Sequence, residues 1–209
     1  MSILITGNLG FIGCWLNIYL QESHPGELIG LDNRSSYGER LCDTSEKSSS
    51  IVKRQYLSSA SDIEELSKIV DRHNVNTIFH ISGQAIVPRA FDEPDLTFDS
   101  NVKSTFAILE VFRRYSSIKK VCIITSDKVY KNENKNKHFT EEDTLGGKDI
   151  YSTSKVICEH LAESYRNIHL DKSKILEVVR LGNVVGGGDY SVNRLIPDLM
   201  RSFLNKKTF

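Results

Sequence analysis

Short apolar runs alternate along the chain with longer segments in which apolar residues recur every three or four positions. The short runs predict buried strands, and the periodic segments predict amphipathic helices. The predicted strands lie at residues 2–6, 27–31, 52–57, 76–81, 120–125 and 174–180, and the predicted helices at 11–21, 62–73, 95–115, 151–166 and 193–204. Strands and helices that alternate in this way favour a parallel sheet covered by helices on both faces, which is a doubly wound α/β domain.

Two stretches are polar enough to form surface loops, residues 33–50 and 131–143. In open α/β sheets, ligands bind outside the carboxyl ends of the strands. A functional site is therefore expected among the residues that directly follow the predicted strands.

The first predicted strand runs into a turn that contains Gly7, Gly10 and Gly13 and opens the first predicted helix. Such glycines allow a tight turn, the close approach of a phosphate to the backbone, and close packing of the helix on the sheet. Asp32 ends the next strand nineteen residues after Gly13, and an acidic residue at about that spacing hydrogen-bonds a ribose diol and disfavours a 2′-phosphate. The alternative is an ordinary turn followed by an aspartate that closes a strand. We favour a dinucleotide site that prefers NAD over NADP.

Three polar residues, Ser126, Asp127 and Lys128, follow the fifth predicted strand. Polar side chains at the end of a buried strand cost free energy unless they are paired, solvated or used in chemistry. Tyr151 and Lys155 are four residues apart on a predicted helix and share one face. A nearby ammonium group lowers the pKa of a tyrosine, which suits Tyr151 to remove a hydroxyl proton as hydride leaves for NAD⁺. In this interpretation Ser126 holds the hydroxyl, Asp127 is a general acid if burial raises its pKa, and Lys128 tunes that acid or, if desolvated, is a base. The alternative is a solvated helix face.

The composition argues against several classes of function. The chain has 209 residues with 27 basic and 27 acidic side chains, so no basic excess indicates binding to nucleic acid or to an anionic membrane. The N-terminus lacks the charged and apolar regions of a signal peptide, and no apolar run is long enough to span a bilayer. The cysteines form no metal-binding pattern, so we expect no metal and a reduced, cytoplasmic protein; Cys122 and Cys158 fit small buried hydrophobic residues. The four cysteines are Cys14, Cys42, Cys122 and Cys158.

Several stretches carry a family resemblance: GNLGFIG (7–13), HISGQAIVPRAFDEP (80–94), TSDKVY (125–130), EEDTLGGKDIYSTSK (141–155) and RLGNVVGGGDYSVNRLIPD (180–198). They resemble the extended short-chain dehydrogenase/reductase superfamily, in its NAD-dependent epimerase/dehydratase branch, which modifies nucleotide sugars. Within that branch the chain is most similar to the CDP-glucose 4,6-dehydratase subfamily, which has lysine where Lys128 stands. The resemblance implies a Rossmann-like NAD-binding domain with the catalytic residues at 1–185 and the start of a substrate-binding region at 186–209.

The resemblance also implies roles in converting CDP-glucose to CDP-4-keto-6-deoxyglucose with tightly held NAD. Tyr151, supported by Lys155, is the base for oxidation at C4, and Ser126 orients the 4-hydroxyl. Asp127 protonates the departing C6 hydroxyl, and Lys128 takes the place of the C5 base. The implied cofactor contacts are Gly7, Asn8, Leu9, Gly10, Phe11, Ile12, Gly13, Asp32, Ser59, Ala60, Ile81, Ser82, Gly83, Asn101, Tyr151 and Lys155, and the implied substrate contacts are Gln84, Ser126, Asn183 and Arg194.

Some positions depart from the family's pattern. Ser59 and Ala60 stand where the family has Asp-Ile, and because that Asp contacts adenine, a lower affinity for NAD is implied. Tyr190, Ile12 and Gly83 replace a usual Trp, Lys and Ala.

Other readings stay open. Residues 33–50 do not follow the CDP-glucose pattern, so another sugar-nucleotide dehydratase or a C4 epimerase remains an alternative. Family members are longer than this chain, which implies that the C-terminal substrate domain is largely absent and leaves a catalytically silent NAD-binding module as a third reading. The family further implies a homodimer in which helices corresponding to 95–115 and 151–166 pair across an axis. The apolar stripe on 95–115 fits either that contact or the core.

Overall fold

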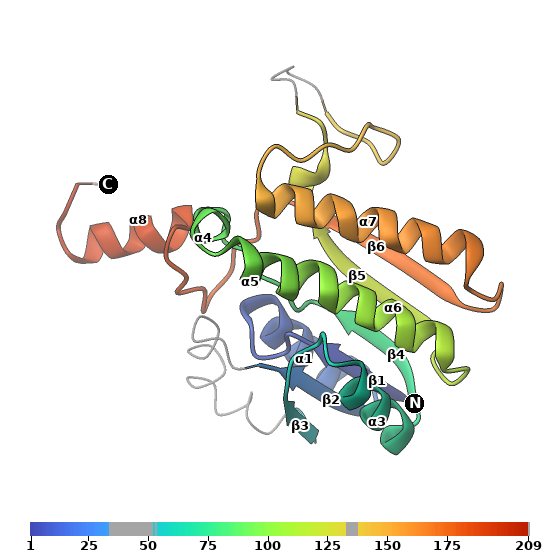
Figure 1. Cartoon of the computed structure of the whole chain (residues 1–209). Helices are drawn as coiled ribbons and strands as arrows, with labels where there is room; N and C mark the ends of the chain where they lie inside the picture. The colour runs from blue at the N-terminus through green and yellow to red at the C-terminus, as the bar shows by residue number, and fades with distance from the viewer. Residues whose placement is uncertain (34–51, 53, 133–137, 209) are drawn as a thin grey trace.

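The structure is a computed structural model of the whole chain, and it describes residues 1–33, 52, 54–132 and 138–208 (Figure 1). The predicted loop at 33–50 lies outside the described residues except for Asn33. The predicted loop at 131–143 is described at both ends but not at 133–137.

Six parallel strands form one sheet in the order β3-β2-β1-β4-β5-β6. The strand order reverses between β1 and β4, and the carboxyl ends of these two strands therefore open the crevice in which doubly wound folds bind ligands. The predicted doubly wound parallel sheet is confirmed, and each predicted strand is found close to its predicted bounds. The strands are β1 (Ser2–Thr6), β2 (Glu27–Asp32), β3 (Arg54–Leu57), β4 (Val75–His80), β5 (Lys120–Ser126) and β6 (Ile175–Leu181).

Helices cover both faces of this sheet (Figure 1). The predicted helix at 95–115 is a continuous helical stretch with a π-helical turn in its middle, and α4 is too short for its periodicity to show in the sequence. The described helical elements are α1 (Phe11–Ser23), α3 (Ile63–His73), α4 (Val87–Asp92), α5 (Pro94–Phe98), the π-helical turn η1 (Asp99–Lys103), α6 (Ser104–Arg114), the 3₁₀ turn η2 (Asp127–Val129), α7 (Ile150–Ile168) and α8 (Leu195–Leu204).

The core consists of two layers, one on each face of the sheet. The larger layer joins the sheet to α3, α6 and α7, and its fully buried members include Leu66, Ile78, Leu109 and Phe112. The smaller layer packs β1 and β2 on α1, around Ile5 and its neighbours. Burial of this apolar surface is the main favourable contribution to folding.

The apolar stripe of the predicted helix 95–115 divides between two environments. Val102, Leu109 and Phe112 are buried in the core, whereas Phe98 and Phe106 remain 44% and 42% exposed. The stripe therefore serves the core along most of its length and leaves two aromatic side chains on the outer face.

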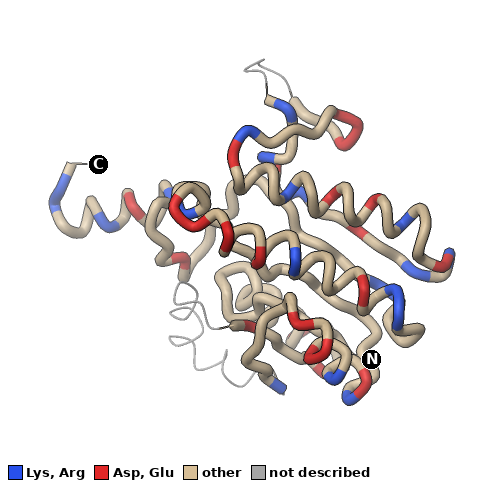
Figure 2. Tube along the Cα trace, in the orientation of Figure 1, with Lys and Arg blue, Asp and Glu red and all other residues tan. Residues whose placement is uncertain are grey.

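Basic and acidic residues are interspersed along α3, α6 and α7 (Figure 2). In the part of the chain that the structure describes, no helix is both long and apolar enough to cross a membrane. No group of three or more potential metal ligands occurs among the same residues.

The cysteines only partly follow the expectation of reduced thiols. Cys122 and Cys158 are buried free thiols, as predicted. Cys14 is disulfide-bonded, so the expectation is wrong at that residue, and Cys42 lies outside the described residues.

Candidate active site

The glycine turn connects β1 to α1 with the geometry that its sequence predicts. Gly7 has φ of 73°, a left-handed conformation that favours glycine, and its N–H donates to the carbonyl of Leu31 at 2.8 Å. A Cβ atom at Gly13 would lie 2.1 Å from the carbonyl oxygen of Gly7, so the third glycine is required for the helix to approach the turn. The carboxylate of Asp32 accepts a hydrogen bond of 3.0 Å from the backbone N–H of Leu9. The turn is thereby joined to the end of β2.

A cavity of about 240 Å³ opens at this turn. It lies at the N-terminus of α1, where backbone N–H groups and the helix dipole favour a pyrophosphate. Among the predicted cofactor contacts, Asn8, Leu9 and Asn101 are not in the cavity wall, and neither are Tyr151 and Lys155. The predicted cofactor contacts that line the cavity are Gly7, Gly10, Phe11, Ile12, Gly13, Asp32, Ser59, Ala60, Ile81, Ser82 and Gly83.

Tyr151 and Lys155 occupy the first turns of α7, and a capping box fixes where that helix begins. Asp149 is the N-cap: its side chain accepts a 2.9 Å hydrogen bond from the N–H of Ser152, and the Ser152 hydroxyl accepts one of 3.2 Å from the N–H of Asp149. Both Tyr151 and Lys155 are buried. The Lys155 ammonium donates to the carbonyl of Ile124 on β5 at 3.2 Å.

Ser126 lies beside Tyr151, as the sequence predicts. Burial raises the pKa of Tyr151, while a hydrogen bond to Ser126 and the positive charge of Arg194 lower it and Asp127 and Asp149 raise it further. The predicted lowering of the Tyr151 pKa is therefore wrong for this structure, because burial outweighs the favourable contacts. Burial also lowers the pKa of Lys155.

The three polar residues that end β5 have different environments. Ser126 is buried, and its hydroxyl donates to the carboxylate of Asp127 at 3.1 Å and accepts from the N–H of Lys128 at 3.2 Å. Asp127 and Lys128 are exposed and begin the turn η2, whose third residue, Val129, is buried. The burial on which the interpretation of Asp127 as an acid depended is therefore not found, and the polar cluster at this strand end is partly paired and partly solvated.

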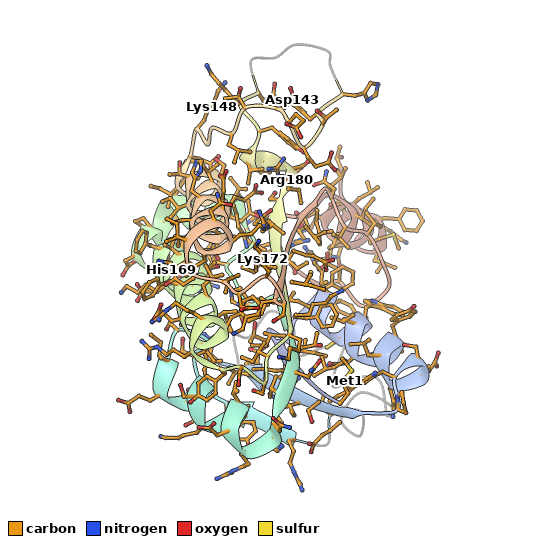
Figure 3. The ribbon with its side chains drawn as sticks, turned by 90° about the vertical axis from the view of Figure 1, so that its right-hand side faces the viewer. Met1, Asp143, Lys148, His169, Lys172 and Arg180 are labelled. Carbon is orange, nitrogen blue, oxygen red and sulfur yellow. The ribbon has the colours of Figure 1, made fainter. Side chains whose placement is uncertain are left out.

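A partly buried ion pair fixes the segment around η2 and was not predicted from the sequence. Arg180 on β6 donates from Nε to both carboxylate oxygens of Glu159 on α7, at 2.9 and 3.0 Å. Glu159 also accepts from the hydroxyl of Thr125 at 2.7 Å. The guanidinium lies 4.8 Å from the ring centre of Tyr130 and donates to the carbonyl of Glu141. Arg180 therefore joins the sheet to the segment beyond η2 that carries Asp143 (Figure 3), and the arginine at the end of an apolar strand was the signal for it.

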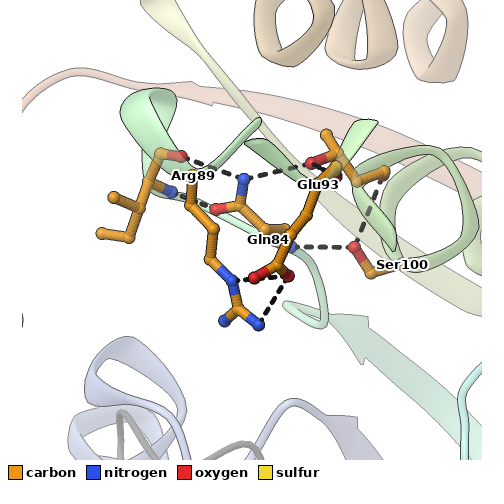
Figure 4. A network of polar contacts seen from close by, with 6 residues as sticks. Gln84, Arg89, Glu93 and Ser100 are labelled. Carbon is orange, nitrogen blue, oxygen red and sulfur yellow. Dashed lines mark hydrogen bonds and ion pairs between the residues drawn. The ribbon is translucent and has the colours of Figure 1, made fainter. Parts of the chain in front are cut away.

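Gln84 was predicted to face the substrate, and in the structure its side chain forms hydrogen bonds with neighbouring residues of the protein (Figure 4). Its amide donates to the carbonyl of Ile86 at 2.9 Å and to the hydroxyl of Thr97 at 3.2 Å. Its oxygen accepts from the N–H of Ile86, and its own N–H donates to Ser100 at 3.2 Å. Both amide donors are occupied, so Gln84 shapes the cavity wall that it lines.

The other two predicted substrate residues differ in position. Arg194 lines the cavity and is the N-cap residue of α8, 3.9 Å from the carboxylate of Asp189. Asn183 is exposed and does not line the cavity.

Asn101 lies in the π-helical turn η1, a feature that often occurs at functional sites. Its amide donates to the carbonyl of Gln84 at 3.2 Å and to the hydroxyl of Ser154 at 2.8 Å. A Cβ atom at Gly83 would lie 2.7 Å from Oδ1 of Asn101 and 3.3 Å from Nζ of Lys155. Glycine at position 83 therefore leaves room for both side chains behind the cavity wall.

His80 is a buried residue at the end of β4 that the sequence analysis did not select. Its Nδ1 is 2.8 Å from the hydroxyl of Thr6, and its Nε2 is 3.2 Å from Ser104 and 3.3 Å from Thr105. Burial, followed by the charge of Lys155, lowers its pKa to about 3. A titratable residue inside the apolar run NTIFHI was the available signal.

The chain is similar in sequence and in fold to known proteins, in agreement with its glycine turn, its serine at a strand end and its buried tyrosine–lysine pair. Residues 3–209 match the NAD dependent epimerase/dehydratase family, and the chain belongs to this family. Its cofactor is NAD. The chain is 33% identical to CDP-glucose 4,6-dehydratase of Salmonella typhimurium over 98% of its own length and 58% of that protein. It is 27% identical to dTDP-D-glucose 4,6-dehydratase of Dictyostelium discoideum, over 99% of the chain and 49% of the relative.

Solved structures show the same fold. The chain superimposes on dTDP-glucose 4,6-dehydratase of Bacillus anthracis in complex with NAD with a TM-score of 0.84 and 26% identity, covering 100% of the chain and 63% of that structure. The dTDP-glucose 4,6-dehydratase DesIV of Streptomyces venezuelae, with NAD bound, gives a TM-score of 0.87 at 22% identity, over 100% of the chain and 64% of that structure. At this identity the second likeness shows the fold alone. The chain thus spans between about half and two thirds of the length of these proteins.

Proposed function

We propose that this chain is the cofactor-binding and catalytic part of a sugar-nucleotide 4,6-dehydratase that converts CDP-glucose to CDP-4-keto-6-deoxyglucose. The observation that carries the proposal is the cluster of Ser126, Asp127 and Lys128 at the end of β5, beside the buried Tyr151 and its neighbour Lys155. The identity to the Salmonella CDP-glucose enzyme supports the choice of CDP-glucose.

In the proposed reaction each residue acts on a defined atom of the sugar. NAD, when bound, accepts hydride from C4 and returns it to C6. Tyr151 accepts the proton of the 4-hydroxyl, and Ser126, within hydrogen-bonding reach of Tyr151, orients that hydroxyl. Lys128 removes the C5 proton, which the adjacent 4-ketone acidifies, and Asp127 protonates the departing C6 hydroxyl. The exposure of Asp127 and Lys128 leaves both side chains accessible to a substrate that approaches this strand end.

The remaining cavity residues would hold the two nucleotides. Phe11 and Ile12 line the cavity in the first turn of α1, where the unpaired N–H groups of a helix N-terminus suit the pyrophosphate of NAD. Asp32 suits the adenine ribose, and the small Ser59 and Ala60 offer adenine no carboxylate. Arg194, which also lines the cavity, suits the diphosphate of the sugar nucleotide.

The test is incubation of the chain with NAD⁺ and CDP-glucose, dTDP-glucose or UDP-glucose, each deuterated at C4. A 4-keto-6-deoxy product with deuterium at C6, formed from CDP-glucose and lost in Tyr151→Phe, would support the proposal. The same product from another nucleotide would move the assignment to another dehydratase. Epimerised sugar with the label still at C4 would identify a C4 epimerase, and NAD binding without turnover would favour a silent module.

Asp127→Asn separates the dehydratase from the epimerase. Elimination of water needs an acid at C6, whereas return of hydride to C4 does not. The variant should therefore stop formation of the 6-deoxy product in a dehydratase and leave turnover nearly unchanged in an epimerase.

We also propose a homodimer formed by the α5–α6 stretch and α7. Phe98 and Phe106 on the outer face of this stretch supply exposed aromatic surface of the kind found at subunit contacts. Light scattering on the wild type and on Phe98→Ser/Phe106→Ser would test it, because loss of the dimer is expected in the double variant.

A further inference from the structure

Asn8 stands in the glycine turn but outside the cavity wall, and its side chain is directed into the fold. The residue is fully buried. Its amide donates to Oε1 of Gln55 on β3 at 2.7 Å, and Nε2 of Gln55 donates back to its Oδ1 at 3.2 Å. These two residues, 47 positions apart, form a reciprocal amide pair.

The backbone of Asn8 does not explain why asparagine is found there. Asparagine is common in turns because it tolerates positive φ. Among the described residues other than glycine, positive φ occurs at Asn74, Asn193 and Lys206. Asn8 therefore has an ordinary backbone conformation, and its amide side chain is the distinctive feature.

Gly30 provides the space for this pair. It lies on β2, in register with Gln55 on the neighbouring strand β3. A Cβ atom at Gly30 would lie 2.3 Å from Nδ2 of Asn8 and 2.5 Å from Oε1 of Gln55. Gly30, Asn8 and Gln55 thus form one cluster, which connects the turn after β1 to the strands β2 and β3.

The remaining contacts of Asn8 tie the pair to the phosphate-binding end of α1. The carbonyl of Asn8 accepts a 3.1 Å hydrogen bond from the buried amide of Asn17. The Cα of Asn8 would lie 2.6 Å from a Cβ at Gly13, so little room exists for the turn to move toward the helix. The side-chain pair fixes Asn8 on the side that faces β3.

We propose that Asn8 and Gln55 are positioning residues that hold the glycine turn in its NAD-binding conformation and thereby set the affinity for NAD. Neither side chain needs to touch the cofactor. Removing Gln55 would leave the buried amide of Asn8 without these two bonds, and the turn would shift to satisfy it. Because the turn leads directly into the N-terminus of α1, whose unpaired N–H groups suit a pyrophosphate, a small displacement of the turn would weaken several cofactor contacts at once.

The test is a double-mutant cycle on the dissociation constant for NAD⁺, measured by titration calorimetry on the full chain. Gln55→Met removes the amide at nearly constant shape, and Asn8→Ala removes its partner. Each change is expected to weaken NAD⁺ binding about threefold to tenfold. The double variant should bind NAD⁺ no more weakly than whichever single variant has the higher dissociation constant. Gln21→Met, an exposed substitution on α1, is the matched control and should leave affinity unchanged.

Thermal unfolding of the same variants separates positioning from simple stability. A lower melting temperature with unchanged NAD⁺ affinity, or losses of affinity that multiply in the double variant, would overturn the proposal. Gln55→Glu keeps an oxygen that accepts from Asn8 and should retain more affinity than Gln55→Met; equal losses would also count against it. Normal NAD⁺ binding without sugar turnover would contradict the proposed dehydratase but not this pair.

Discussion

The ammonium group of Lys155 donates a hydrogen bond of 3.2 Å to the backbone carbonyl of Ile124. This bond joins the first turns of α7 to the last part of β5, just before Ser126. Lys155, which we propose supports Tyr151, is therefore held by the strand that ends in Ser126. A cation that is buried and hydrogen-bonded in this way keeps a fixed position, which is what orientation of a cofactor and a substrate requires.

Lys155→Met should reduce sugar turnover by about a hundredfold or more while the chain remains folded. The methionine fills the same space but supplies neither charge nor donor. Steady-state rates at saturating NAD⁺ measure the effect. Lys103→Met, at a lysine side chain that is 59% exposed, is the control, and a Lys155 variant as active as that control would remove the lysine from the mechanism.

Arg194→Gln should move the ascending, low-pH limb of the pH–rate profile to higher pH. The charge of Arg194 lowers the pKa of Tyr151, so its removal raises that pKa, and less of the tyrosine is deprotonated at any given pH. We therefore expect this limb to move to higher pH and not to lower pH. The profile of kcat against pH measures it, with Arg72→Gln, remote from the cavity, as the control. A shift to lower pH would contradict this prediction. An unchanged profile with an altered KM would show that Arg194 acts on the substrate only.

Glu110→Gln should destabilise the fold at neutral pH and much less in acid. Hydrogen bonds from Arg113, Tyr165 and Arg114 lower the pKa of Glu110 from 4.5 to about 2. Because the folded pKa is depressed, the stabilising contribution is fully present above about pH 4.5 and is lost as the pH falls toward about 2. We expect a loss of about 1–2 kcal/mol at pH 7, reduced by the solvent exposure of both arginines.

Urea unfolding at pH 7 and at about pH 3 measures this dependence. Glu163→Gln changes a glutamate side chain that is 64% exposed and is the matched control on α7. An equal loss at both pH values would mean that packing, rather than charge, accounts for the effect of Glu110.

The succession of strands and helices along the chain, the glycine turn and the tyrosine–lysine pair could be predicted because each depends on local spacing. Gly7 adopts a positive φ, and a Cβ at Gly13 would meet the backbone of Gly7 and Asn8, a few residues before it. Tyr151 and Lys155 share a face through helix geometry alone. In each case the sequence contains the whole physical cause.

The features that the sequence did not reveal depend on tertiary contacts. Gln84 was expected to face the substrate; it lines the cavity, and its amide also donates to Thr97. The pKa of Tyr151 was expected to fall, but burial by the surrounding elements raises it. The interpretation of Asp127 as an acid depended on burial, but its side chain is exposed. Spacing along the chain carries no information on such tertiary contacts, and the pairing of Asn8 with Gln55 could not be found from it for the same reason.

The last prediction concerns His80, whose hydrogen bonds define its tautomer. The Thr6 hydroxyl accepts from the N–H of Ser82 at 3.4 Å and can therefore donate to Nδ1 of His80. The hydroxyls of Ser104 and Thr105 donate to backbone carbonyls of the preceding turn, so they accept from Nε2. His80 should thus be neutral, with its proton on Nε2.

Since its pKa is lowered to about 3, His80 should stay neutral from about pH 8 to about pH 5, whereas an unperturbed histidine would gain a proton there. Long-range ¹H–¹⁵N spectra of histidine-labelled protein report both properties, with His80→Gln used to assign the signal. A ring that gains its proton near pH 6.5, or one protonated on Nδ1, would contradict this arrangement, whereas a ring that stays neutral with its proton on Nε2 would agree with it.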